Sequence, residues 1–335
     1  MKKLLLVVTM FLTVFTLSAC NNEKVLTVYF VPSRDAAEIL EATEPLKEML
    51  IEELAAQGYE YDKVEIFVGS TYEAAAEAMV SGQAEIGFLP GGTYVLYSED
   101  GAVDVALTAT RGGLNKDFPD AKDWNDGTAT EGDSSNQVTY YRGLVIAGPS
   151  AKGQAIANKV NAGTALTWAD MEELTWCVRS ATSSSGYIYP TLVLMDMFDK
   201  TFDDLPQAQV IQTDGYGTSM GNLASESCDV ATFYADARRD YADKWEDATE
   251  GFDRDASIWA ETNVILVTDP IYNDTISVST ELVDEDLKAA IQQAFINIAA
   301  TSEGQEIIAI YSHQGYAVAE DSDYDSERDA QELLY

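Results

Sequence analysis

The sequence predicts an α/β protein with two lobes, each a mostly parallel sheet flanked by helices. Three observations support this prediction. Strand-like and helix-like segments alternate in the N-terminal part, a second alternating series follows a polar stretch at residues 111–137, and helix-like segments come near the end of the chain. Such alternation is typical of parallel sheets with helices on both faces. The length of 335 residues also fits two domains better than one.

The first lobe is predicted at residues 20–140. Short apolar runs indicate its strands, at residues 24–31, 63–68, 84–89 and 103–109. Apolar residues near helical spacing indicate helices, at residues 36–57, 73–81 and 94–98. Gly58 and Gly82 follow two of these helices, which is a common way for a helix to end. Residues 111–137 are rich in Gly, Asp, Asn, Ser and Thr, which favours an exposed excursion, either a hairpin or an insertion.

The second lobe is predicted at residues 141–270. Its strands are indicated at residues 138–147, 174–178, 208–212, 228–233 and 263–268. Its helices are indicated at residues 154–162, 191–198 and 218–226. Residues 271–335 would return to the first lobe through a strand at 275–278 and helices at 284–302 and 303–311. Crossings near Tyr141 and Pro270 leave a ligand cleft between the two lobes.

The N-terminus has the features of a secretory signal peptide over residues 1–19. Met1-Lys2-Lys3 gives a positive start, and an apolar run extends from Leu4 to Leu17. The run is too short for a stable membrane span. The ending Leu17-Ser18-Ala19-Cys20 resembles the lipobox of bacterial lipoproteins. This resemblance implies that Cys20 is lipidated and anchors the protein to the outer face of the cell membrane. A plain signal peptide with a chance cysteine is the alternative.

The charge balance is strongly acidic, with 57 acidic and 20 basic residues and a net charge of −37. This argues against a nucleic-acid partner, because such binding depends on Lys and Arg at phosphates. It does not exclude a small anion, since fixed N–H groups act at contact distance while charges beyond about 10 Å are largely screened at 0.1 M salt. We therefore expect a soluble extracytoplasmic protein, most simply a monomer.

Cysteine and histidine are scarce. Beyond Cys20, the chain has Cys177 and Cys228, each beside a strand-like run, and His313 is its single histidine. We predict two buried free thiols, with a disulfide as the alternative in an oxidising compartment. Without a Cys/His cluster, neither a zinc site nor another metal or cofactor is expected.

The segment Ser180-Ala181-Thr182-Ser183-Ser184-Ser185-Gly186-Tyr187-Ile188-Tyr189-Pro190 lies between a predicted strand and a predicted helix. Ser and Thr cap free backbone N–H groups. A helix N-terminus also carries unpaired donors and a partial positive charge. Together these features suit a phosphate-like anion without any Lys or Arg. An ordinary capped turn is the alternative.

The order and spacing of several motifs resemble one protein family, the solute-binding lipoproteins of ABC transporters for phosphonate, phosphite and phosphate-like oxyanions. The resemblance covers residues 24–316 except 111–137. It rests on Phe30-Val31-Pro32-Ser33, Pro45-Leu46, the stretch from Tyr72 to Gly82, Ala84-Glu85-Ile86-Gly87-Phe88-Leu89-Pro90 with Thr93-Tyr94-Val95-Leu96, the hydroxyl segment, Cys228-Asp229-Val230-Ala231-Thr232 and Pro270-Ile271-Tyr272-Asn273-Asp274. It implies a periplasmic-binding-protein-like fold of type II and a membrane permease as partner.

The resemblance also implies roles for individual residues. Thr182, Ser183 and Ser184 would hold the anionic oxygens through hydroxyls and backbone N–H groups. The opposing lobe would close over the ligand with two tyrosines at helix starts, Tyr72 and Tyr94.

Three further residues fall near ligand contacts of the family. Tyr216 stands where the family often has histidine. Asp236 and Asp274 fall near the acids that hold the amino group of a ligand, and such an acid could instead accept a hydrogen bond from a monoprotonated oxyanion. The tyrosines could alternatively be core aromatics, and the two acids could be helix caps or surface residues.

Two other functions compete with import of a phosphorus oxyanion. The same fold could bind a sulfonate, a thiamine precursor or another organic anion, or could serve a sensor that feeds a membrane kinase. The serine cluster also suggests a serine hydrolase or phosphatase. However, the sequence has no G-x-S-x-G elbow, and His313 lies late in a predicted helix end, so we expect no enzyme.

Overall fold

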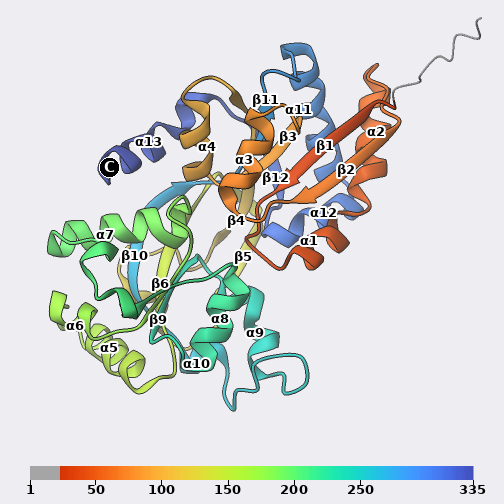
Figure 1. Cartoon of the computed structure of the whole chain (residues 1–335). Coiled ribbons are helices and arrows are strands. Elements are labelled where there is room, and N and C mark those ends of the chain that lie inside the picture. Colours follow the sequence, from red (N-terminus) through yellow and green to blue (C-terminus); the bar gives the residue numbers. More distant parts are fainter. Residues whose placement is uncertain (1–22, 335) are drawn as a thin grey trace, which may run out of the picture.

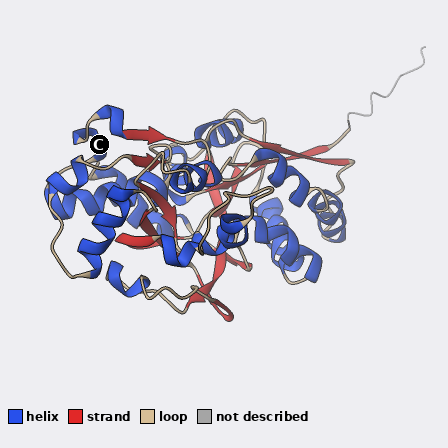
Figure 2. Ribbon diagram, turned by 90° about the horizontal axis from the view of Figure 1, so that it is seen from below, coloured by secondary structure: helices blue, strands red, loops and turns tan. Residues whose placement is uncertain are grey.

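The computed structural model describes residues 23–334 and contains two sheets, each flanked by helices (Figure 1). Seen from below, helices lie on both sides of the strands (Figure 2). The predicted α/β architecture with two lobes is confirmed. The predicted signal peptide and Cys20 lie outside the described residues. Within residues 23–334, no helix combines the length and apolarity that a membrane crossing requires.

The first sheet has seven strands, with β12, β4, β11, β3, β1 and β2 in spatial order and β5 paired to β4. Their bounds are β1 Val25–Phe30, β2 Lys63–Val68, β3 Ile86–Leu89, β4 Val103–Leu114, β5 Gly132–Val138, β11 Thr275–Ser279 and β12 Gly315–Val318. The flanking helices are α1 Ala36–Thr43, α2 Leu46–Ala56, α3 Tyr72–Val80, α4 Gly91–Ser98, α11 Glu285–Ala299 and α12 Ser302–Ile308.

The second sheet has five strands in the order β10, β6, β9, β7 and β8. Their bounds are β6 Tyr140–Ala147, β7 Trp176–Val178, β8 Val210–Gln212, β9 Val230–Tyr234 and β10 Asn263–Tyr272. Its helices are α5 Ala151–Asn161, α6 Trp168–Glu172, α7 Tyr189–Phe198, α8 Tyr216–Ala224, α9 Arg238–Glu246 and α10 Ile258–Glu261. A last helix, α13 Asp325–Glu332, lies beside α4 at the upper left of the molecule (Figure 1).

Each sheet is mixed, whereas the sequence predicts mostly parallel sheets. β1 pairs in parallel with β2 and β3, and β7 with β8 and β9. The strands that carry the chain between the lobes pair in the antiparallel sense, as β11 does with β3 and β4, and β6 with β9 and β10. A strand that crosses over from the other lobe enters the sheet from the side of that lobe. It therefore pairs antiparallel with the strands beside it.

The polar stretch at residues 111–137 forms part of a hairpin, because β4 continues to Leu114 and pairs with β5. It is not wholly exposed. Trp124 is 1% exposed in the core of the second lobe, where its Nε1 donates to the carbonyl of Phe118 at 2.9 Å. One apolar ring thus fastens the excursion to the second lobe.

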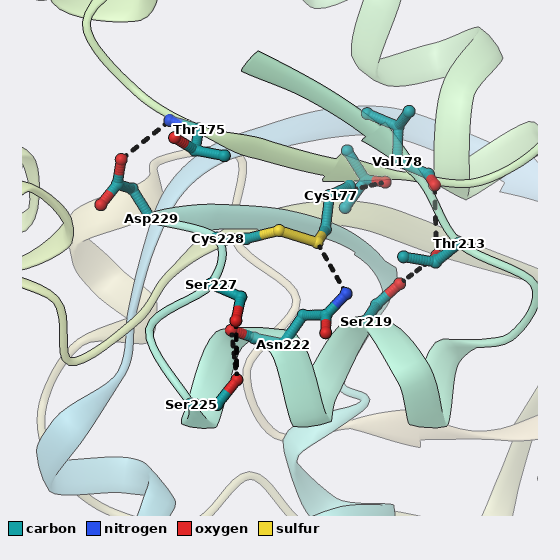
Figure 3. Close-up of a disulfide and its surroundings, with 11 residues drawn as sticks. Thr175, Cys177, Val178, Thr213, Ser219, Asn222, Ser225, Ser227, Cys228 and Asp229 are labelled. Atoms are coloured by element: carbon teal, nitrogen blue, oxygen red, sulfur yellow. Dashed lines mark hydrogen bonds between the residues drawn. A yellow bond between two sulfur atoms is a disulfide. The ribbon is translucent and has the colours of Figure 1, made fainter. Parts of the chain in front are cut away.

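A disulfide joins Cys177 to Cys228, with 5.8 Å between the Cα atoms (Figure 3). This corrects the prediction of two free thiols. β7 lies next to β9 with Cys177 opposite Ala231, and this pairing brings the segment before β9 against β7. The sequence shows two strand-like runs but not that they are neighbours in the sheet.

Candidate ligand-binding site between the lobes

A cavity lies between the lobes, near the ends of β1 and β3 in the first lobe and of β7 and β9 in the second. Ligands of open α/β sheets bind outside the carboxyl ends of the strands. The first lobe contributes Val31, Ser33, Arg34, Tyr72, Phe88, Leu89, Pro90 and Arg111, with Asp274, Tyr311 and His313 from the returning chain. The second lobe contributes Tyr141, Ser183, Ser184, Ser185, Tyr216 and Tyr234.

Three consecutive serines, Ser183, Ser184 and Ser185, form one wall of the cavity. They follow β7 and lead through a π-helical turn, Ser184–Ile188, into α7. Each is at most 2% exposed. The hydroxyls of Ser183 and Ser185 lie 3.3 Å and 2.9 Å from the phenol oxygen of Tyr216. The sequence thus brings three hydroxyls and the first N–H groups of a helical segment to one place.

The serine wall is supported by Arg179, which is 2% exposed and does not line the cavity. Its backbone N–H donates to the carbonyl of Gly186 at 3.1 Å, and a Cβ at position 186 would collide with the Arg179 side chain. Its guanidinium lies 5.3 Å from the ring centres of both Tyr72 and Tyr216. A buried positive charge therefore stands directly behind two rings of the site.

In the same cavity, Arg111, Asp274 and His313 form a charged group. A guanidinium nitrogen of Arg111 lies 2.8 Å from Asp274, and the guanidinium lies 4.6 Å from the ring centre of Tyr141. Burial opposes the charge on Asp274, but the hydrogen bond from His313 and the charge of Arg111 outweigh it, so the pKa of Asp274 lies below its usual value. Burial lowers the pKa of His313, against the effect of Asp274. At neutral pH we therefore expect an ionised acid beside a neutral imidazole.

Two buried nitrogens of this group have no hydrogen-bond partner among the described residues. They are Nε of Arg111 and Nδ1 of His313. Buried polar groups are nearly always satisfied in folded proteins, and an exception needs an explanation. Both residues line the cavity. An anionic oxygen of a ligand would accept from Nε of Arg111, and a protonated oxygen or amino group would donate to Nδ1 of His313, because a neutral imidazole that donates from Nε2 to Asp274 can only accept at Nδ1.

The two lobes are in direct contact around the cavity. Arg34, just after β1, donates to Asp240 at 2.6 Å and to the phenol oxygen of Tyr234 at 3.1 Å. Ser312 also donates to Asp240, at 2.9 Å. The backbone N–H of Tyr216 donates to the carbonyl of Ser33 at 3.2 Å. This arrangement corresponds to a closed state of the cleft.

Five of the predicted ligand contacts line the cavity together: Tyr72, Ser183, Ser184, Tyr216 and Asp274. They come from four separate segments of the chain. The structure thus brings these five side chains together in one interlobe cavity, and their role as ligand contacts stays a prediction.

Three other predicted contacts do not line this cavity. Thr182 donates to the carboxylate of Glu73 at 2.7 Å, so its hydroxyl joins the lobes instead. Tyr94 is 0% exposed, and its phenol donates to Asp321 at 2.5 Å within the first lobe. The carboxylate of Asp236 is held by Arg238 at 2.7 Å and by Thr130 at 2.7 Å, beside a neighbouring cavity.

Sequence reasoning missed several lining residues, namely Ser33, Arg34, Arg111, Tyr141, Ser185, Tyr234 and His313. Ser185 continues the predicted serine run and Ser33 ends the motif Phe30-Val31-Pro32-Ser33, so local signals exist for both. Arg111 begins the stretch that the composition predicts to be exposed. The position of His313 late in a predicted helix end gives no sign that it lines the cavity.

The chain matches a known family model and is similar in fold to several solved structures. The family model of phosphonate ABC-transporter periplasmic substrate-binding proteins matches residues 28–324. A binding-protein component of a phosphonate ABC transporter from Pseudomonas aeruginosa is 13% identical, with a TM-score of 0.63 over 93% of this chain and 87% of that one. PhnD1 from Prochlorococcus marinus, solved with methylphosphonate, is 13% identical, with a TM-score of 0.60 over 93% and 99%.

A third similar structure comes from Mycoplasma hyorhinis and is described as a candidate thiamine pyrophosphate transporter. It is 15% identical, with a TM-score of 0.68 over 92% of this chain and 98% of that one. Identities this low show a shared fold and no more. A search of curated proteins found no match to the chain.

Proposed function

The chain belongs to the family of periplasmic substrate-binding proteins of phosphonate ABC transporters, and from this premise we propose which groups of the cavity hold a phosphorus oxyanion. The family is one of extracytoplasmic transport proteins that work with an ABC transporter in the membrane. In our proposal the anionic head lies between Ser183–Ser185 and Arg111. The observation that supports this proposal most directly is that Arg111 and His313, each with a buried nitrogen that lacks a partner, line the same cavity as three serines.

Each group has a distinct role in this proposal. The serine hydroxyls, the phenol of Tyr72 and Nε of Arg111 donate to anionic oxygens, and a hydrogen bond from a charged donor is the stronger kind. The neutral imidazole of His313 donates from Nε2 to the ionised Asp274, so its Nδ1 can only accept, from a protonated oxygen or an amino group of the ligand. Asp274, held ionised, can only accept. It therefore favours a ligand that carries a proton, either a monoprotonated phosphonate or an amino-phosphonate, over fully ionised sulfate.

The organic part of the ligand has room in a neighbouring cavity. This cavity shares Arg111, Tyr141, Tyr234 and His313 with the first one, and Arg142 and Arg239 line it as well. A ligand with an organic substituent could therefore keep its phosphorus head at the serines and extend past Arg111. This continuity favours a substituted phosphonate or phosphate over inorganic phosphate.

Calorimetry on the chain from residue 21 onward tests the proposal. The panel contains phosphate, phosphite, methylphosphonate, 2-aminoethylphosphonate, thiamine pyrophosphate and sulfate. We expect a phosphonate to bind most tightly. Arg111→Gln should weaken its binding at least about tenfold, which corresponds to the loss of one hydrogen bond from a charged donor. Arg254→Gln is the matched control, because Arg254 is also paired to a carboxylate, at 2.8 Å from Glu261, but lies away from the cavity. Tighter binding of sulfate than of every phosphorus compound would refute the ligand assignment.

We also propose that the protein is a monomer held at the membrane by lipid on Cys20, from where it delivers its ligand to the permease. The motif Leu17-Ser18-Ala19-Cys20 supports this anchor. Cys20→Ser should move the protein from the membrane fraction to the soluble fraction. Unchanged fractionation would refute lipid attachment at this residue.

A further inference from the structure

The last helix, α13, brings a carboxyl group into the contact between the lobes. Glu327 is 0% exposed. A Cβ at position 91 would lie 3.0 Å from Cγ of Glu327, so this close approach depends on the glycine that opens α4. Farther along α13, the side chain of Gln331 donates to the carbonyl of Gly92. The helix thus packs against the start of α4, and Figure 1 shows the two helices side by side.

Glu327 contacts the ligand site through one serine. Oε2 of Glu327 lies 3.3 Å from Oγ of Ser184, and Oε1 has no hydrogen-bond partner among the described residues. The same Oγ accepts the backbone N–H of Gly92 at 2.9 Å. Ser184 itself lines the ligand cavity. One hydroxyl therefore joins α4, the buried carboxyl and the cavity.

The protonation state of Glu327 decides what Ser184 can offer a ligand. A hydroxyl has one proton to donate and two lone pairs that accept. An ionised carboxylate only accepts, so it takes the Ser184 proton and leaves a lone pair toward the cavity. A protonated carboxyl can donate to Ser184, whose own O–H is then free to donate to an anion.

We propose that Glu327 is a positioning residue that must be protonated for tight anion binding, because its proton turns the Ser184 hydroxyl into a donor toward the ligand. Glu327 itself does not contact the ligand. Ligand binding is instead coupled to proton uptake at this carboxyl group of the last helix. This inference rests on the proposed anion site at the serines.

The surroundings of Glu327 support a neutral carboxyl near pH 7. Burial raises the pKa of Glu327 to about 8, against the hydrogen bond from Ser184 and the effect of the nearby phenol of Tyr189, and the charge of Asp274 raises it further. The neighbouring phenols of Tyr189, Tyr141 and Tyr324 have pKa values raised above the usual 10 by burial. The next cation on α13, Arg328, is paired with Asp321 and Asp325. These phenols stay neutral and Asp274 stays ionised between pH 6.5 and 9, so Glu327 is the group of this set that titrates there.

The test compares the dissociation constant for methylphosphonate in the wild type and in Glu327→Gln at each pH from 6.5 to 9. The ratio at a given pH cancels the titration of the ligand. Glutamine stays neutral and keeps an N–H that can donate to Ser184. We expect a ratio near one at pH 6.5, with the wild type about tenfold weaker than the variant at pH 9. Glu332→Gln, an exposed acid on the same helix, is the control and should follow the wild type.

Proton counting adds an independent measurement. Calorimetry at pH 8 in buffers of different ionisation enthalpy should show about half a proton more taken up by the wild type than by Glu327→Gln. Ser184→Ala should take up about half a proton less than the wild type, because its Glu327 no longer controls a donor toward the ligand. This comparison needs only these two proteins, so it holds as a test even if Glu327→Gln folds poorly. Proton uptake by Ser184→Ala equal to that of the wild type would overturn the positioning role and leave only charge repulsion.

The failure of this inference can be told from the failure of the proposed function. If methylphosphonate binds and the pH profiles of wild type and Glu327→Gln run parallel, the role of Glu327 is refuted while the anion site stands. If no phosphorus anion binds at any pH, the proposed site is refuted and the role of Glu327 with it.

Discussion

The contact that closes the cleft gives the sharpest prediction, because Asp240 can be changed without altering a residue that lines the cavity of the serines; Asp240 lines the neighbouring cavity. Asp240 of the second lobe accepts hydrogen bonds from Arg34 at 2.6 Å and from Ser312 at 2.9 Å, both across the cleft. Burial opposes the charge on Asp240, but Arg34 and Tyr234 hold its pKa below the usual value. Asp240→Asn therefore removes an ionised acceptor from the closed state.

The magnitude follows from these contacts. A hydrogen bond to a charged group contributes about 1.5–3 kcal/mol. The side chains of Arg34 and Asp240 are 14% and 24% exposed, so solvent weakens the pair, and asparagine keeps one acceptor. We expect the closed state to lose about 2 kcal/mol. If the free protein is mostly open, this loss appears in full as a dissociation constant about 30-fold larger.

Calorimetry with methylphosphonate measures this change, and small-angle scattering measures whether the liganded variant still closes. The control is Glu38→Gln, which breaks a second ion pair between the lobes, Lys244 with Glu38 at 3.0 Å. These side chains are 50% and 49% exposed, so the affinity should change less than about twofold. Unchanged affinity in Asp240→Asn, or an equal loss in Glu38→Gln, would contradict the role assigned to the buried contact.

Three further predictions concern the site and the stability of the fold. Ser183→Ala should weaken phosphonate binding about tenfold, whereas Tyr94→Phe should change the affinity by less than about twofold and lower the free energy of unfolding by about 1 kcal/mol. Calorimetry measures the affinities and urea unfolding measures the stability. Similar effects of both variants on affinity would contradict the prediction. Reducing the Cys177–Cys228 disulfide, which spans 51 residues, should lower the free energy of unfolding by about 4 kcal/mol. Urea unfolding with and without reductant measures this change, and overlapping unfolding curves would contradict it. Because the pKa of Glu327 is raised from 4.5 to about 8 in the folded state, its favourable contribution is complete below pH 4.5 and is lost progressively as the pH rises from 4.5 through 8. The loss amounts to about 5 kcal/mol at most, and it should be absent from the pH dependence of unfolding of Glu327→Gln.

The sequence predicts those parts of the site that a single local segment builds. The run from Ser183 to Ser185 stands between a strand and a helix, and strand–helix alternation places such a turn at the end of a sheet. Tyr72 is also predictable, because it is the first residue of α3 and follows the end of β2 closely. In both cases the position along the chain fixes the position in space.

Tyr94 shows where the same reasoning fails. It also follows a strand, but α4 begins at Gly91, so Tyr94 is the fourth helical residue, and its ring packs against Tyr324 with ring centres 5.1 Å apart. The two glycines that open α4 leave space for Ser184 and Glu327 to approach. Which side of a short helix faces the cleft depends on the helix start, and composition does not determine that start to within one residue.

Other parts of the site depend on pairings between distant segments. Arg111 reaches the cavity because β4 continues beyond the edge of the main sheet to pair with β5. His313 comes just before β12, which pairs with the same strand β4. Neither pairing has a local signal in the sequence, and the same is true of the approach of Cys228 to Cys177.

The charges of the cavity explain how a protein of net charge −37 can bind an anion. Arg34 is neutralised by Asp240 and Arg111 by Asp274, and His313 is neutral at pH 7. Behind the tyrosine rings, Arg179 donates to the carbonyls of Pro32 and Thr213 rather than to a carboxylate, while exposed Asp214 acts on it at longer range.

With Glu327 protonated, the ionisable groups that line the cavity, taken together with Asp240, Arg179 and Glu327, therefore sum to one positive charge, that of Arg179. Ionisation of Glu327 brings this local sum to zero. Surface acids farther than about 10 Å are largely screened at 0.1 M salt, so the ligand responds to the local sum more than to the net charge of the protein. A single buried carboxyl on the last helix thus has more influence on the affinity for an anion than the many exposed acids.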